Sequence, residues 1–331
     1  MPRFDKTRVA IVTRSRFRSP RYLAKGLQRM LARGEVAVDC YVHGLSWLEA
    51  IKCRSASRRH AAVAAFADLW LKYLRRYDVI VVSDTIGIAR DAMLLAPLRL
   101  LAKPLLLYEV FALSGSKYFL DQMPKSALSQ FDAFLVSSAI HDDPLVEGPP
   151  IFEIGLELLE PPTTQQAKPM VAMLDFGRPG YEADRQIQVD ALENLRIRQF
   201  CLDGEYSFTD IVAEYDKAAA AFLAFPEAFG IPIAQLQNRG SLIVAPHRHW
   251  AKRHALLPAG SVFADDNAPF TDNFVFYRDK ADLKEKLRAA TANYRPDLIA
   301  KRFRDAQPHL VNGNLIELNR ALQYARQTRR P

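Results

Sequence analysis

The sequence is poor in cysteine and contains no hydrophobic run long enough to cross a membrane. Its three cysteines, Cys40, Cys53 and Cys201, are too few and too far apart for a disulfide framework or for paired metal ligands, so we expect buried thiols. No apolar run reaches the roughly 20 residues of a transmembrane helix. Residues 1–13 lead into a strand-like segment without a signal-peptide core, and we therefore expect a cytoplasmic protein.

Low-complexity tracts are also absent, which excludes fibrous and disordered classes of protein. Hydrophobic residues make up 49% of the chain and charged residues 25%, with 14 glycines and 20 prolines, as in globular proteins. A length of 331 residues exceeds that of an ordinary domain, so the sequence predicts two packed domains.

The net charge of +8 comes from the N-terminal part of the chain. Residues 1–76 hold 17 basic and 5 acidic side chains, whereas residues after position 150 hold 23 of each. Basic residues within 47–76 surround an apolar helical pattern, which is typical of a helix that packs on a sheet and also of one that binds an anionic bilayer. We expect residues 1–76 to meet an acidic partner such as an anionic membrane surface. No nucleic acid is expected, because no recognisable reading module is present.

Short apolar runs, most of them followed by helical patterns, recur in both halves of the chain. They cover residues 8–13, 36–42, 78–82, 104–110 and 131–137, and then 169–174, 197–202, 219–224 and 242–245. This alternation predicts α/β domains with parallel sheets, in which ligands bind beyond the carboxyl ends of the strands. A proline-punctuated stretch over 148–169, with a strand-like segment at 151–154, is interpreted as the crossing between the two halves.

The predicted organisation is therefore two Rossmann-like domains that face each other across a cleft. The first covers residues 1–160 and would bind an acceptor, and the second covers residues 161–312 and would bind a nucleotide. Helical patterns are also present near 279–291 and 313–327, and we expect residues 313–331 to form a C-terminal helix that can pack back on the first domain.

Residues 219–246 carry the most informative pattern, which reads as strand, tight loop, helix, glycine and strand. Glu227 falls at the end of the first strand, Gly230 permits close approach of the backbone, and Pro232 suits a first helical turn. A helix that begins there offers unpaired N–H groups and the positive end of its dipole to a diphosphate. Glu227 is also consistent with a carboxylate that only satisfies the helix dipole.

This segment resembles the retaining glycosyltransferases of the GT-B fold and family 4 type, whose hallmark Glu-x-Phe-Gly-x-Pro is matched by residues 227–232. The resemblance implies that Glu227 contacts hydroxyls of the transferred sugar. It implies that the backbone N–H groups facing the sugar and the diphosphate are those of Phe229, Gly230 and Ile231. The second glutamate of the family, which contacts the nucleotide ribose, is replaced by Gln235, whose amide can hydrogen-bond without the charge.

Residues 174–179 read Leu-Asp-Phe-Gly-Arg-Pro and are similar to the strand and Gly-Arg pair of the same family. The resemblance implies that Arg178, with Arg185 as the later basic residue, holds the donor phosphates and stabilises the leaving group without a metal. Surface arginines that only face solvent are the alternative interpretation of both.

The first half matches the family less well, because the loop at 13–18 lacks the glycine pair common there. Glu109 follows the run 104–108, where the family often has a polar residue. A carboxylate in that place can orient or deprotonate an acceptor hydroxyl, and it is equally consistent with a paired structural acid.

Three histidines, His247, His249 and His254, follow the strand predicted at 242–245. They are interleaved with arginine and lysine, which would repel a divalent cation, so no metal site and no cofactor are expected.

Together these patterns predict a metal-independent hexosyltransferase. It would move a sugar from a nucleotide diphosphate donor to an envelope glycan or a lipid-linked acceptor, with retention of anomeric configuration, at the inner face of the cell membrane. Two alternatives stay open: an epimerase of nucleotide sugars on the same fold, and a non-catalytic protein that binds sugar nucleotides or polyanions, which the Gln235 replacement favours.

The basic surplus of residues 1–76 predicts binding to anionic membranes. Each lysine or arginine near such a surface adds about 1 kcal/mol, so we expect co-sedimentation with vesicles that contain phosphatidylserine and much less with pure phosphatidylcholine vesicles. The difference should shrink at high salt because screening weakens the attraction. Equal sedimentation with both vesicles would remove the argument for a membrane partner.

Overall fold

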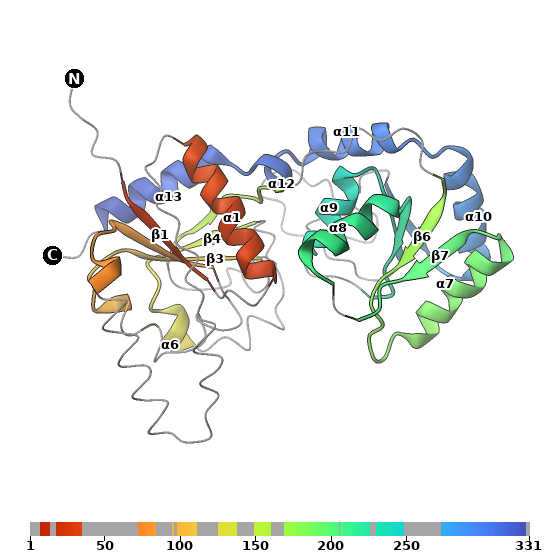
Figure 1. Cartoon of the computed structure of the whole chain (residues 1–331), viewed down its shortest axis with the longest axis horizontal. Coiled ribbons are helices and arrows are strands. Elements are labelled where there is room, and N and C mark those ends of the chain that lie inside the picture. The colour runs from red at the N-terminus through yellow and green to blue at the C-terminus, as the bar shows by residue number, and fades with distance from the viewer. Residues whose placement is uncertain are drawn as a thin grey trace, which may run out of the picture. The chain divides into compact units, whose positions relative to one another are not determined.

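The structure, a computed structural model, describes residues 7–13, 18–34, 72–83, 95, 98–110, 125–137, 149–159, 169–204, 206–225, 230–247 and 273–328. The chain divides into two compact units (Figure 1). The first unit comprises Met1–Leu159 and Asn312–Pro331, and the second comprises Glu160–Val311. In the described part of each unit, one five-stranded sheet is formed and all of its strand pairs are parallel, which confirms the predicted α/β class.

The sheet of the first unit has the strand order β1-β2-β3-β4-β5. Its strands are β1 (Val9–Val12), β2 (Val79–Val82), β3 (Leu105–Glu109), β4 (Ala133–Val136) and β5 (Ile151–Glu153). The predicted runs 8–13, 78–82, 104–110 and 131–137 are confirmed, and the run 36–42 lies outside the described residues. The strand-like segment predicted at 151–154 forms β5, which pairs with β4. The chain passes to the second unit after Leu159, within the proline-punctuated stretch 148–169.

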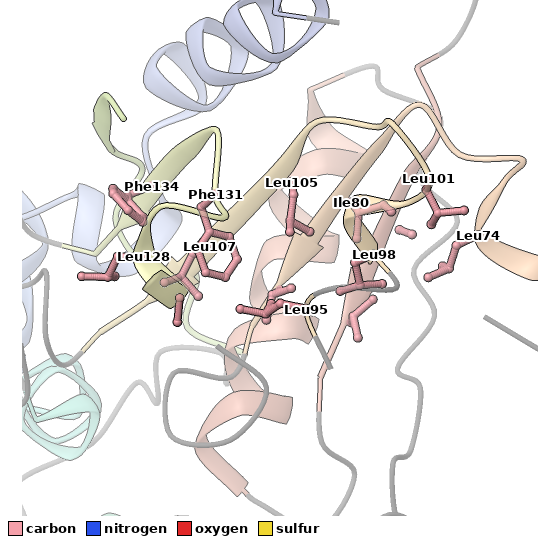
Figure 2. Packing of buried hydrophobic residues seen from close by; sticks show 14 of the residues in the cluster. Leu74, Ile80, Leu95, Leu98, Leu101, Leu105, Leu107, Leu128, Phe131 and Phe134 are labelled. Atoms are coloured by element: carbon pink, nitrogen blue, oxygen red, sulfur yellow. The ribbon is translucent and has the colours of Figure 1, made fainter. Parts of the chain in front are cut away.

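Both faces of this sheet are covered, which explains why its strands are apolar at nearly every position. Side chains alternate between the two faces of a strand. Figure 2 shows one face, where strand residues pack against a leucine-rich layer and α6 (Lys125–Leu128); the labelled residues are Leu74, Ile80, Leu95, Leu98, Leu101, Leu105, Leu107, Leu128, Phe131 and Phe134. Over the other face, α13 (Leu315–Gln327) contacts β2, β4 and β5, and α1 (Arg18–Arg33) contacts β1 and α13.

The chain leaves the first unit after Leu159 and returns to it at Asn312, and both places are tied to α1. The N–H of Gly313 donates to the carbonyl of Leu156 at 3.0 Å. Arg33 of α1 contacts both the Glu157 carboxylate and the Asn312 carbonyl. These contacts join the outgoing and the returning segment within the first unit.

The sheet of the second unit has the strand order β10-β9-β8-β6-β7. Its strands are β6 (Val171–Leu174), β7 (Arg198–Cys201), β8 (Ala220–Phe222), β9 (Leu242–Pro246) and β10 (Phe274–Tyr277). The four runs predicted in this half are confirmed, and β10 is an additional strand that the sequence did not predict.

Helices cover both faces of the second sheet (Figure 1). One face packs against α7 (Glu182–Asn194) and α10 (Lys280–Ala292), and the other against α8 (Phe208–Lys217) and α9 (Ile231–Asn238). The chain then continues through α11 (Pro296–Ala306) and α12 (His309–Asn312). Because α7 follows β6 and α9 follows β8, the connections from these two neighbouring strands diverge to opposite faces. A divergence of this kind is the switch point at which open α/β sheets bind ligands.

No helix among the described residues is both long and apolar enough to span a bilayer.

Gly240 ends the turn after α9 in a backbone conformation that side chains disfavour. Its φ is +76°, and an added Cβ would lie 2.3 Å from the Pro296 carbonyl oxygen at the start of α11. We expect Gly240→Ala to lower the free energy of unfolding of the second unit by more than about 3 kcal/mol. Gly204 is the matched control, because its φ is also positive while an added Cβ meets no atom within 4 Å.

For Gly204→Ala we expect a loss of about 1 kcal/mol, from backbone strain alone. Urea titrations followed by circular dichroism would measure both variants. A Gly240→Ala protein that unfolds at the same urea concentration as Gly204→Ala would contradict the close approach to α11.

Candidate functional site

Two loops meet at the switch point of the second unit. One joins β6 to α7 over residues 175–181, and the other joins β8 to α9 over residues 223–230, of which 226–229 lie outside the described residues. The strands β6 and β8 are neighbours, and the N–H of Asp175 donates to the carbonyl of Phe222 at 3.1 Å. Residues from both loops are thereby brought to one point of the carboxyl edge.

Arg185 of α7 connects the ends of these two strands. Its guanidinium donates to the carbonyl of Asp175 at 2.9 Å and to the carbonyl of Phe222 at 3.2 Å. It also donates to the side chain of Gln188 at 2.8 Å, and Gln188 in turn donates to the carbonyl of Leu223 at 2.9 Å. Burial lowers the pKa of Arg185, and the Asp175 carboxylate opposes that shift. Arg185 therefore holds the two loops together, and a contact with donor phosphates remains a prediction for it.

Arg178, in contrast, lies exposed in the β6–α7 loop and rests on an aromatic ring. Its guanidinium carbon is 3.6 Å from the centroid of the Phe225 ring, within the range of a cation–π contact. Tyr181 packs against the same ring, with a centroid distance of 5.8 Å. The structure thus places Arg178 where the two loops meet. Sequence reasoning did not identify Phe225 or Tyr181, because nothing in their spacing signals a stack.

The carboxyl group of Asp175 interacts electrostatically with both Arg178 and Arg185. Its Oδ1 accepts the N–H of Phe176 at 2.8 Å. Burial raises the pKa of Asp175, while the Phe176 N–H, Arg178 and Arg185 act in the opposite direction. The desolvation of this carboxylate therefore outweighs the attraction of its cationic neighbours.

The start of α9 has the geometry that the sequence predicts for it. Gly230 precedes the helix with φ at +66°, in the left-handed region that favours glycine, and Pro232 lies in the first turn. The N-cap residue is glycine and provides no side-chain hydrogen bond to the N–H groups of the first turn, at the positive end of the helix dipole. Ile231 begins the helix and is buried.

Gln235 lies one turn into α9 and is buried. Its backbone carbonyl accepts from Arg239 at 3.1 Å, and Arg239 is fixed by Asp216 at 2.9 Å. A contact between the Gln235 amide and a ribose remains a prediction. Two further predicted residues, Glu227 and Phe229, lie outside the described residues.

In the first unit, Glu109 is the last residue of β3, level with Val136 of β4, and it is fully buried. The residues that directly follow β1, β2 and β4 are Thr13, Ser83 and Ser137, and each is fully buried as well. The Thr13 hydroxyl donates to the carbonyl of Ser83 at 2.8 Å. Three hydroxyl groups and one carboxylate therefore lie side by side at the carboxyl ends of the neighbouring strands β1 to β4. The sequence analysis missed this row, although a polar residue after each apolar run is a visible signal.

Of the three histidines near β9, only His247 is described, and it is exposed with its ring against Phe276. The described residues contain no group of three or more histidine, cysteine, aspartate or glutamate side chains arranged to hold a metal ion. The segment 47–71 also lies outside the described residues, whereas nine of the 17 basic residues within 1–76 are described.

Comparison with solved structures shows that the chain has the GT-B fold, as predicted. An alpha-glucosyltransferase in complex with UDP-glucose and DNA containing an abasic site matches with a TM-score of 0.61, 9% identity and coverage of 97% of this chain and 99% of its own. UDP-GlcNAc 2-epimerase from Neisseria meningitidis, bound to UDP-GlcNAc, matches with a TM-score of 0.61, 7% identity and coverage of 96% and 100%.

The catalytic domain of Starch Synthase IV from Arabidopsis thaliana, bound to ADP and acarbose, matches with a TM-score of 0.54 and 11% identity, over 98% of this chain and 100% of that domain. No protein-family model matches the sequence, and no curated protein matches it significantly. Identities this low show a common fold.

The raised pKa of Asp175 predicts a pH-dependent effect on stability. A carboxyl group whose pKa is higher in the folded state contributes stability below its ordinary pKa of 3.8, and this contribution is lost as the pH rises through the raised value. We expect Asp175→Asn to raise the melting temperature at pH 8, because asparagine can still accept the Phe176 N–H without a charge. The gain should vanish near pH 4.

The exposed Asp203, in the loop after β7, provides a control substitution to asparagine with a change within about 0.5 kcal/mol. Thermal unfolding at several pH values would measure both variants. A melting temperature of Asp175→Asn below that of the wild type at pH 8 would show that the carboxylate stabilises the site.

Proposed function

We propose that this protein is a glycosyltransferase that takes a hexose from a nucleoside diphosphate sugar held by the second unit. One observation carries the proposal. At the switch point of a GT-B fold, Arg178 lies on the β6–α7 loop, and the β8–α9 loop ends at the glycine before α9. Arg185 joins these two loops. A cation beside a helix start whose N-cap residue is glycine suits a diphosphate, because both provide positive potential and N–H donors.

The donor would be held as follows. Its diphosphate would accept hydrogen bonds from Arg178 and from the first-turn N–H groups of α9, which the missing side chain of Gly230 leaves accessible. Glu227 would contact hydroxyls of the sugar, and Gln235 would contact the ribose. As the bond from the anomeric carbon to the diphosphate oxygen breaks, negative charge builds on the leaving group, and Arg178 stabilises it without a metal ion.

The acceptor would bind to the first unit. The oxygen of an acceptor hydroxyl would form the new bond to the anomeric carbon, with retention of configuration. A base would take the proton of that hydroxyl. Glu109, in the row with Ser83 and Ser137, is the residue we propose to orient that hydroxyl or to receive its proton.

A glycan or lipid-linked acceptor at the inner membrane face fits the charge of the first unit. In the described part, α1 exposes Arg21, Lys25 and Arg29 at four-residue intervals, so these basic side chains lie on one side of the helix. Arg29 also donates to the carbonyl of Leu159 at 2.7 Å. This basic side of α1 supports a peripheral contact with anionic lipid.

The solved structures support a nucleoside diphosphate as the ligand, since those described above contain UDP-glucose, UDP-GlcNAc and ADP. They also favour a second candidate function. The UDP-GlcNAc 2-epimerase has the same TM-score as the glucosyltransferase, so the fold alone does not separate transfer from epimerisation. A non-catalytic binding protein is the third reading, because Gln235 replaces a glutamate of the family it resembles.

A two-step experiment tests the proposal. Thermal shift against UDP-, GDP-, dTDP-, ADP- and CMP-sugars should identify one donor class, since a ligand at 100 times its Kd stabilises the folded state by about 2.7 kcal/mol. With that donor, we expect Glu227→Ala to reduce sugar transfer or donor hydrolysis by at least about 100-fold without loss of folding.

Glu193→Ala, an exposed substitution at the far end of α7, is the matched control and should keep full activity. Formation of an epimeric nucleotide sugar in the absence of any acceptor would favour the epimerase. Donor binding without turnover would favour the non-catalytic protein, and no shift with any sugar nucleotide would contradict the proposal.

A further inference from the structure

We propose that Phe225 is a positioning residue that sets the guanidinium of Arg178 for the donor diphosphate. This inference rests on the proposed function, in which Arg178 contacts that diphosphate. Phe225 follows the end of β8 by three residues and stands two residues before Glu227. It touches no reacting group itself, and it would act through the arginine stacked on it.

The geometry of the stack is specific. The Phe225 side chain is only 2% exposed, whereas Arg178 is exposed, so a buried ring supports a cation at the surface. The guanidinium carbon lies 3.6 Å above the ring centroid. The Tyr181 ring packs against Phe225 with its plane tilted by 59°, which restricts the phenylalanine ring from a second direction.

The backbone on both sides of the stack is also fixed. The carbonyls of Phe222 and Leu223, just before Phe225, are held by Arg185 and Gln188 at 3.2 and 2.9 Å. On the other loop, the N–H of Tyr181 donates to the Arg178 carbonyl at 3.3 Å. The ring and the arginine therefore belong to two anchored loops, and their contact joins them directly.

An aromatic ring can support an anion-binding arginine without occupying its donors. A guanidinium that stacks on a ring uses its flat face, and the stack consumes none of its N–H donors. A phenyl ring carries no net charge, so the contact with Phe225 does not itself neutralise the guanidinium. Phe225 thus restrains the side chain and reduces the rotamer freedom that it would lose on binding.

Donor titration of two single variants separates positioning from a purely structural role, with UDP-glucose as the probe. Phe225→Leu keeps an apolar side chain and removes the aromatic face, and Arg178→Lys keeps the charge and removes the planar group. We expect each to weaken binding of UDP-glucose about tenfold, which corresponds to about 1.4 kcal/mol. Phe225→Tyr keeps the ring and should bind like the wild type.

The double variant Phe225→Leu/Arg178→Lys provides the decisive readout, because residues that act through one contact are not additive. We expect it to bind UDP-glucose no more weakly than Arg178→Lys alone. A further tenfold loss in the double variant, or wild-type affinity in Phe225→Leu, would overturn the inference while leaving the proposed function intact. If Phe225→Leu does not fold, Phe225→Met takes its place and should also weaken binding of UDP-glucose, because it removes the aromatic face while arginine is present. Phe225→Tyr/Arg178→Lys keeps the ring and should bind UDP-glucose like Arg178→Lys.

The kinetic constants give a readout that a change in folding alone would not produce. Phe225→Leu should raise KM and lower kcat together with donor affinity, since Arg178 would contact the diphosphate both before and during bond breakage. Lower activity with unchanged KM and kcat per folded molecule would point to stability alone and would contradict positioning. Failure of the wild type to bind any sugar nucleotide would instead remove the proposed function on which the inference rests.

Discussion

The hydrogen bonds from Arg185 to the carbonyls of Asp175 and Phe222 hold the carboxyl ends of β6 and β8 together, and the two loops of the candidate site depend on them. At the end of a strand the sheet no longer supplies partners for every carbonyl, and a buried unpaired carbonyl costs about as much as a lost hydrogen bond. Arginine can serve both carbonyls because its donors form a rigid fork. The cost is the desolvation of the guanidinium, which lowers its pKa.

The charges around this point divide into a half-buried part and an exposed part. Asp175 and Arg185 attract one another, although burial still raises the pKa of the carboxyl group. Arg178 is exposed and lies on the Phe225 ring. Arg185 therefore holds the two loops together, and Arg178 lies at the surface where they meet. This division agrees with a site that must attract a diphosphate while keeping its own loops in place.

The carboxyl edges of the two sheets differ in their chemistry. In the first unit, the strands end in Thr13, Ser83, Glu109 and Ser137, which provide hydroxyl groups and one carboxylate. In the second unit, the described residues of the corresponding edge provide a guanidinium and a helix start with glycine at its N-cap. Hydroxyl and carboxylate groups suit a polyhydroxylated acceptor, and the cationic edge suits a diphosphate. The two edges thus match the roles that the proposed function gives to the two units.

The sequence alone determined the local elements, because the periodicity of apolar residues is a local property. Strands β1 to β9 were identified in this way, and the glycine before α9 was identified from the motif around it. Strand β10 was not identified, since its short run Phe-Val-Phe-Tyr follows a long stretch without a periodic pattern. The family resemblance pointed to Arg178, with Arg185 as the later basic residue, as ligands of the donor phosphates.

Only the tertiary structure decided which arginine donates to backbone carbonyls and which is stacked on Phe225. In chain order β7 stands between β6 and β8, whereas in the sheet β6 lies beside β8. The order of strands is decided by how helices on both faces pack, and that packing brings together residues more than forty positions apart. A sequence pattern can therefore identify the candidate arginines, whereas the contacts of each one depend on how the sheet is packed.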